Sequence, residues 1–220
     1  MHYKKSLLSL LLVSVGLLAS GCNSSLGMSF ANAKSKANIS YKQGDLESAI
    51  KHLSDVISAS PSDIDSLFKR ADSYAELERH KDAIADWGKI IELDPKNTAA
   101  IYNRGISHRR SGQPDKAIED YTSYINMMPS DPDGYVARGI ILTAYSRNHS
   151  EALIDFQKAI ELEPENFSAH LYSGVSYTAL ERLEKAIKSL SRAIEIKPKD
   201  SRAYDYRSSA FALNNQLQNA

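Results

Sequence analysis

The sequence of 220 residues contains one cysteine, Cys22, so the chain cannot form an intramolecular disulfide. It has no excess of charge, with 27 basic and 27 acidic side chains. Nucleic-acid-binding proteins usually carry a basic excess, so the composition gives no support to that function. A glycine-rich phosphate loop is absent, and the 6 histidines do not pair with cysteine or carboxylates at metal-ligand spacing. These absences predict a protein that is not an enzyme and that has no metal or cofactor site.

The sequence also lacks an apolar run long enough to span a membrane. Residues 6–20, SLLSLLLVSVGLLAS, form an apolar stretch of about 15 residues, whereas a spanning helix needs about 20. Lys4 and Lys5 precede this stretch and Gly21 follows it. A short basic segment, an apolar segment and small residues are typical of an export signal, so residues 1–21 are predicted to be a cleaved signal peptide. A retained anchor is the alternative.

Residues 18–22, LASGC, resemble the bacterial lipoprotein box, in which the cysteine receives lipid and becomes the mature N-terminus. Ala19 departs from the leucine that is usual there. The resemblance implies lipidation of Cys22 with fatty acids such as palmitate, followed by a short linker over residues 22–29. Asn23 rather than aspartate follows the cysteine, which in that family favours the outer membrane, facing the periplasm. An ordinary secretion signal with a stray cysteine is the alternative.

Five prolines recur at a nearly constant interval. They are separated by 34, 34, 35 and 34 residues, and each stands in a similar context, as in LDPKN (93–97): Pro61, Pro95, Pro129, Pro164 and Pro198. With each proline at position 32, repeats start near residues 30, 64, 98, 132 and 167, and a sixth begins at 201. The extra residue of the third interval, which is 35 residues long, falls in AYSRNHSEA of repeat 4.

Apolar residues stand at fixed positions within these repeats. Position 8 is small, position 20 is alanine, and position 28 is isoleucine in every full repeat. Position 24 is large: Leu53, Trp87, Tyr121, Phe156 and Leu190. Spacings of 20, 21, 24, 27 and 28 place these side chains on one stripe of an α-helix.

This pattern resembles the tetratricopeptide repeat, a helix–turn–helix unit of 34 residues, over most of residues 30–220. The resemblance implies an all-α fold, an α-solenoid of five repeats near 30–63, 64–97, 98–131, 132–166 and 167–200, with a capping helix in 201–220. Each proline should end the second helix of a repeat. The residue two positions later should cap the next helix by accepting a backbone N–H: Asp63, Asn97, Asp131, Asn166 or Asp200.

Oppositely charged residues vary together between two repeat positions. Position 7 is arginine and position 23 is aspartate in repeats 2, 3 and 4, whereas repeat 5 has Ser173 and Ser189. The sequence therefore predicts structural ion pairs within a repeat or between neighbours, namely Arg70–Asp86, Arg104–Asp120 and Arg138–Asp155. A phosphate or carboxylate site at these arginines is the alternative. Arg207, in the capping helix, has no such acid and is expected to reach back to repeat 5.

In tetratricopeptide proteins, helix A positions near 2, 5, 9, 12 and 13 face a concave groove that holds an extended peptide or a partner's helix. The resemblance implies a partner-binding groove at Phe68, Tyr102, Ile106, Arg109, Arg110, Val136, Ile140, Leu171 and Val175. Two alternatives are that part of this stripe belongs to the core and that it is a self-association surface in a homo-oligomer. Lys34 and Asn38 begin a carboxylate-clamp pattern that the later repeats do not complete, so chaperone-tail binding is not expected.

The predicted function is a lipid-tethered, non-catalytic scaffold that binds protein partners in the bacterial cell envelope, for example cell-wall enzymes. A pilus or secretion-system assembly lipoprotein is the first alternative. A secreted soluble protein, or an enzyme with no membrane anchor, is the second. Without residues 1–21, which contain Lys4 and Lys5 and no acid, the net charge is −2.

Overall fold

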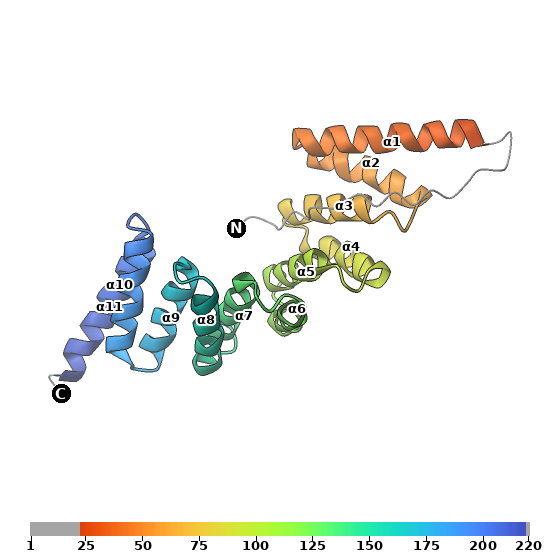
Figure 1. Cartoon of the computed structure of the whole chain (residues 1–220). Helices are drawn as coiled ribbons and strands as arrows, with labels where there is room; N and C mark the ends of the chain where they lie inside the picture. Colours follow the sequence, from red (N-terminus) through yellow and green to blue (C-terminus); the bar gives the residue numbers. More distant parts are fainter. Residues whose placement is uncertain (1–22, 219–220) are drawn as a thin grey trace. The chain divides into compact units, whose positions relative to one another are not determined.

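The structure, a computed structural model, describes residues 23–218, with side chains for residues 31–215. This part of the chain contains helices and turns but no strand, which confirms the all-α prediction. The helices are α1 (Asn23–Gln43), α2 (Leu46–Ala59), α3 (Ile64–Glu76), α4 (His80–Leu93), α5 (Thr98–Arg110), α6 (Pro114–Met127), α7 (Pro132–Ala144), α8 (His149–Leu162), α9 (Phe167–Ala179), α10 (Leu183–Ile196) and α11 (Ser201–Gln218) (Figure 1). The predicted signal peptide and Cys22 lie outside the described residues.

Two compact units divide the chain, with the boundary after Gln113, inside repeat 3. Unit 1 contains α1–α5 and unit 2 contains α6–α11. Odd-numbered helices are the A helices of the repeats, and even-numbered helices are the B helices. In each unit the A helices of neighbouring repeats touch one another, α1 with α3, α7 with α9 and α9 with α11. Within each unit, we call the face that the A helices form the A side, and the opposite face the B side.

In repeats 1, 2, 4 and 5 the core lies between the two helices of the repeat. The large side chains at position 24 are buried, and Trp87, Tyr121 and Phe156 have no exposed surface. Trp87 packs against small residues of α3 such as Ala71. In repeats 4 and 5 a Cβ on the position 8 glycine would meet the opposite side chain, 2.6 Å from Phe156 for Gly139 and 2.4 Å from Leu190 for Gly174. Glycine therefore permits an approach that alanine does not.

The joints between repeats share one geometry. Each B helix ends two residues before the proline, as predicted. In all five joints the N–H of position 34 donates to the carbonyl of position 31, at 3.0–3.2 Å. Four of the five predicted caps accept a backbone N–H: Asn97 from Ala100, Asp131 from Asp133, Asn166 from Ala169 and Asp200 from Arg202. Asp63 does not, because its carboxylate accepts hydrogen bonds from the side chains of Lys34 and Ser66 instead.

The turns within repeats also share a geometry, a residue with a positive φ angle, but this residue is a glycine in only two of them. Gly44 and Gly112 have positive φ angles of 76° and 73°. The equivalent residues of repeats 2 and 5, Glu78 and Glu181, have φ angles of 58° and 56°, although they carry side chains. Such a left-handed residue ends an α-helix in the Schellman arrangement. In repeat 4 the left-handed residue is Arg147, within a turn that is one residue longer, as the 35-residue interval predicts.

Both ends of the described chain differ from expectation. Helix α1 begins at Asn23, so the residues expected to form a linker before residue 30 are helical. Helix α11 caps repeat 5, but its aromatic residues Tyr204 and Phe211 do not supply the inward face, because they are 42% and 46% exposed. The residues of α11 that are buried against repeat 5 are Ala203 and Ala210, each of which precedes an exposed aromatic residue by one position.

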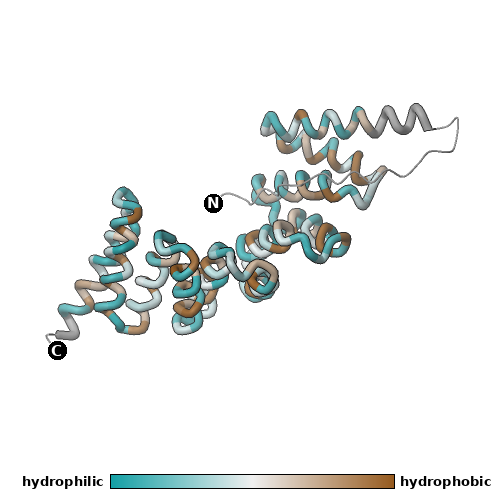
Figure 2. Tube along the Cα trace, viewed as in Figure 1, coloured by the Kyte–Doolittle hydropathy of each residue, from teal (hydrophilic) through white to brown (hydrophobic). Residues whose placement is uncertain are grey.

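Hydrophilic and hydrophobic residues are mixed along the helices that Figure 2 colours. Accordingly, no helix in residues 23–218 combines the length and the apolar character that crossing a membrane requires.

Candidate partner-binding surface

The predicted groove residues all lie on A helices, but they fall into two classes by exposure. Tyr102, Ile106, Val136 and Leu171 are buried, with exposed fractions of 6%, 4%, 8% and 1%. These four side chains belong to the core, as the alternative interpretation held, because A-helix positions 5 and 9 also contact neighbouring helices. An open groove lined by them is therefore wrong, and they offer a partner little surface.

The other predicted residues remain accessible. Phe68, Ile140 and Val175 are half-buried, Arg109 is half-buried and Arg110 is exposed. Phe68 rests edge-on against Trp87, with ring centroids 4.7 Å apart, so its packing in unit 1 fixes its position. Burial, and then the nearby Arg110, lower the pKa of His80, which keeps this imidazole neutral near pH 7.

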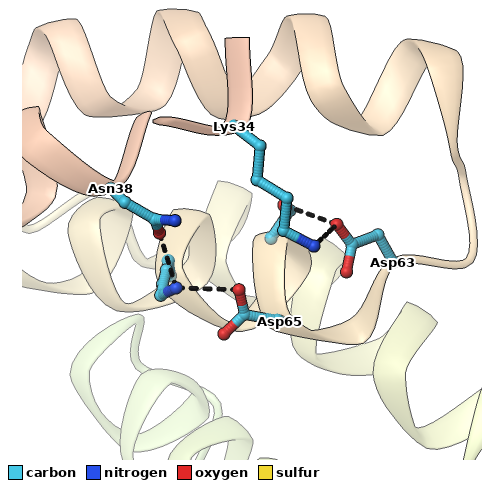
Figure 3. Close-up of polar contacts among 6 residues, drawn as sticks. Lys34, Asn38, Asp63 and Asp65 are labelled. Atoms are coloured by element: carbon cyan, nitrogen blue, oxygen red, sulfur yellow. Dashed lines mark hydrogen bonds and ion pairs between the residues drawn. The ribbon is translucent and has the colours of Figure 1, made fainter. Parts of the chain in front are cut away.

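A polar network joins α1 to α3 on the A side of unit 1 (Figure 3). Lys34 Nζ donates to Asp63 Oδ2 at 2.7 Å. Lys69 Nζ donates both to Asn38 Oδ1 and to Asp65 Oδ2, each at 2.7 Å. The two residues that begin the clamp pattern are therefore engaged by their own neighbours. Asp63 as the partner of Lys34 and Lys69 as the partner of Asn38 were not predicted from the sequence, although lysine and aspartate at corresponding ends of adjacent A helices were a readable signal.

Tyr41 adds a further link between the same two helices. Its hydroxyl donates to Asp72 Oδ2, and burial together with this hydrogen bond raises the pKa of Tyr41. The phenol therefore stays protonated and acts as a donor across the accessible pH range. The hydrogen bond of Tyr41 and those of the two lysines therefore connect α1 to α3 on the A side.

Two of the three predicted ion pairs are confirmed. Arg70 binds Asp86 through two hydrogen bonds of 2.7 Å, and Arg138 binds Asp155 at 2.9 and 2.7 Å. Hydrogen bonds to the aspartates raise the pKa values of both arginines, and burial raises the pKa of Asp155 against the opposing effect of Arg138. The third pair, Arg104 and Asp120, falls in different units and stays a prediction. In the two confirmed pairs the arginines are structural.

A hydroxyl at position 25 of the preceding repeat completes each of these arginine sites. Nη1 of Arg70 donates to Ser54, Arg138 to Thr122 and Arg207 to Ser191, at 3.0–3.1 Å. The contact of Arg207 confirms that the capping helix reaches back to repeat 5. These hydroxyls were not predicted from the sequence, although a serine or threonine stands at position 25 of the repeat before Arg70, Arg138 and Arg207. The repeat before Arg104 has Gly88 at that position.

Within the described residues, no group of three or more histidine, cysteine, aspartate or glutamate side chains could hold a metal ion.

Comparison with known proteins places these features in a family. No curated protein matches the chain in sequence. The model of the tetratricopeptide repeat family matches residues 35–98, 68–135 and 141–201. The fold is similar to that of MamA from Desulfovibrio magneticus RS-1, with 18% identity over 78% of this chain and 96% of MamA and a TM-score of 0.72.

Two further solved structures share the fold. YrrB, described as a tetratricopeptide protein with an unusual peptide-binding site, is 24% identical over 78% of this chain and 88% of its own, with a TM-score of 0.69. A tetratricopeptide repeat protein from Parabacteroides merdae ATCC 43184 is 19% identical over 86% of this chain and 75% of its own, with a TM-score of 0.77. Because the family model covers more than half of the residues and the repeats have the expected helices and joints, the chain belongs to the tetratricopeptide repeat family.

Proposed function

We propose that the protein is a non-catalytic scaffold that binds a peptide segment of a protein partner on its A side. The observation that carries this proposal is the presence of two half-buried apolar residues, Ile140 and Val175, on the contacting helices α7 and α9. Apolar residues held on a rigid, partly exposed surface are suited to anchoring a partner's side chains. The family supports this function, and so does YrrB, a structural relative that is described as having a peptide-binding site.

The scaffold is proposed to act in the bacterial cell envelope, tethered to the outer membrane by lipid on Cys22. The lipoprotein-like stretch at residues 18–22 and Asn23 support this location. Partners would then be other envelope proteins, such as cell-wall enzymes. A single lipid chain gives marginal membrane binding, so stable anchoring requires more than one acyl chain.

A double substitution, Ile140→Ser with Val175→Ser, tests the A-side surface. Envelope proteins captured by the wild-type chain are identified by mass spectrometry and compared with those captured by the variant. Met127→Ser is the matched control, because Met127 is 41% exposed at the end of α6, a B helix. We expect the double variant to lose at least one partner by tenfold or more, and the control to retain it.

Identical partner sets from the wild type and the double variant would overturn the A-side proposal. The remaining alternative is self-association, which light scattering tests by measuring the mass of the particle in solution. A dimer that is lost in the double variant would identify the A side as a self-association surface instead.

A further inference from the structure

Repeat 5 differs from repeats 2 and 4 at a place where those repeats carry an internal arginine. In repeat 4, the guanidinium of Arg138 fills the space between Asp155 of α8 and Thr122 of α6. The corresponding residues of repeat 5 are Ser173 at position 7 and Ser189 at position 23, with Gln157 at position 25 of the preceding repeat. Neither serine is long enough to fill that space.

A pocket of about 770 Å³ occupies this position, between α8, α9 and α10 of unit 2. Its walls include Gln157, Ser173, Ser189 and Ser191. The volume lies within the range of roughly 300–1,000 Å³ that is typical of ligand pockets. The pocket thus results from the omission of one structural arginine and its aspartate, and it contains none of the A-side residues proposed above.

The charges around this pocket favour an anion. Lys185, Lys188 and Arg192 of α10 line it, against one acid, Glu195. Arg192 is neutralised by Glu195 at 2.8 Å and by Glu165 at 3.2 Å. In the described part of the chain, by contrast, neither Lys185 nor Lys188 is paired with an acidic side chain. Because the serine at position 23 replaces an aspartate, no carboxylate opposes these lysines from that position.

The same pocket has an apolar wall and continues along α8. Leu153, Ile160 and Tyr177 supply apolar surface. A neighbouring hollow of about 470 Å³ shares Leu153, Gln157 and Tyr177 with it and extends to Ser150 and the exposed Ile154. Residues 150–161 of a helix span about 17 Å, which is the length of roughly five extended residues. An elongated site of this length fits a peptide better than a compact molecule.

We propose that this pocket binds an acidic peptide segment of a protein partner, with a glutamate or aspartate carboxylate between Lys185 and Lys188. An apolar residue next to that acid packs against Leu153 and Tyr177, and the segment follows α8 past Ile154. The site lies between α8, α9 and α10 and contains neither Ile140 nor Val175. A scaffold with both surfaces holds two segments at once.

Restoring the missing pair tests the proposal. In the full chain, Ser173→Arg with Ser189→Asp recreates the arrangement of repeat 4 and fills the pocket from within. The probe is a fluorescein-labelled pool of capped hexapeptides with glutamate at one fixed position and leucine, alanine or serine elsewhere. A second pool has glutamine at the fixed position. Fluorescence anisotropy measures the binding of both pools.

We expect the wild-type chain to bind the glutamate pool at least tenfold more tightly than the glutamine pool, and the refilled variant to lose this preference. Lys188→Glu should reduce binding at least tenfold, while Lys199→Glu, at an exposed lysine outside the pocket, should not. Equal binding of the two pools, or binding by the refilled variant that matches the wild type, would overturn the proposal. If the free carboxylate 4-methylpentanoate binds as tightly as the peptides, the ligand is a small molecule and the peptide assignment is wrong.

Discussion

Individual residues in left-handed turns carry strain that the sequence does not reveal. Glu78 and Glu181 have the positive φ that Gly44 and Gly112 adopt without a steric penalty. An L-residue in this conformation costs about 1–2 kcal/mol, which is partly offset because glycine loses more entropy on folding. These turns are therefore points at which the native sequence is not the most stable one.

Glu181→Gly should stabilise the protein by about 0.5–1 kcal/mol, since it removes the steric cost at φ 56°. Urea unfolding followed by circular dichroism measures the change. Gly112→Ala is the matched control and should destabilise by about 1 kcal/mol. A decrease in stability for Glu181→Gly would show that contacts of the glutamate outweigh the strain.

The Arg138–Asp155 pair sets a second prediction for single residues. The Asp155 side chain is 3% exposed, so Arg138→Ala leaves a nearly buried carboxylate without its guanidinium. We expect a loss of about 3 kcal/mol in the free energy of unfolding. Arg192→Ala removes exposed ion pairs with Glu165 and Glu195 and should change the free energy of unfolding far less, because solvent screens such pairs. Equal losses in the two variants would contradict a structural role that depends on burial.

At the scale of helices, the contact between A and B helices depends on position 8. A Cβ at Gly174 would lie 2.4 Å from Cγ of Leu190, whereas one at Gly88 would meet only Arg104 Nη1, at 4.0 Å. The same chemical change should therefore have opposite effects at these two helical glycines.

Gly174→Ala should destabilise the protein by about 1–2 kcal/mol, because overpacking outweighs the gain in helix propensity. Gly88→Ala should stabilise it by about 0.5–1 kcal/mol, because only the propensity gain applies. Thermal unfolding of the two variants checks both signs. Stabilisation by Gly174→Ala would mean that α9 and α10 separate at little cost.

Elements were predictable where a repeated position has one structural role. The helices, the prolines and the large residues at position 24 recur in phase in five copies, and the arginine–aspartate pattern of Arg70 and Asp86 recurs in three, so the copies reinforce each inference. The groove was less predictable, because positions 5 and 9 of an A helix contact either a partner or a neighbouring helix. Sequence periodicity places Tyr102 and Leu171 on the same stripe as Ile140 and Val175, but only packing distinguishes buried from accessible members.

For the whole molecule, the proposed membrane tether makes a direct prediction. Radiolabelled palmitate should be incorporated into the wild-type protein and not into Cys22→Ala, since this is the only cysteine. The Cys22→Ala variant should also leave the membrane fraction, as no described helix is suited to crossing a membrane. Equal labelling of both proteins would contradict lipidation at Cys22.

The equivalence of the five joints has a consequence for how such a chain changes length. Each joint is closed by the same local hydrogen bond, from position 34 to position 31 of the same repeat. If a block of 34 residues were removed between two joints, the hydrogen bond of its own joint would be removed with it. The repeats on either side would then be connected by a joint of the same form. Duplication or deletion of a block by recombination within the gene would thus leave every remaining boundary intact. The one-residue insertion lies in the turn before α8 and not at a joint. The extra residue therefore leaves the hydrogen bonds of all five joints unchanged.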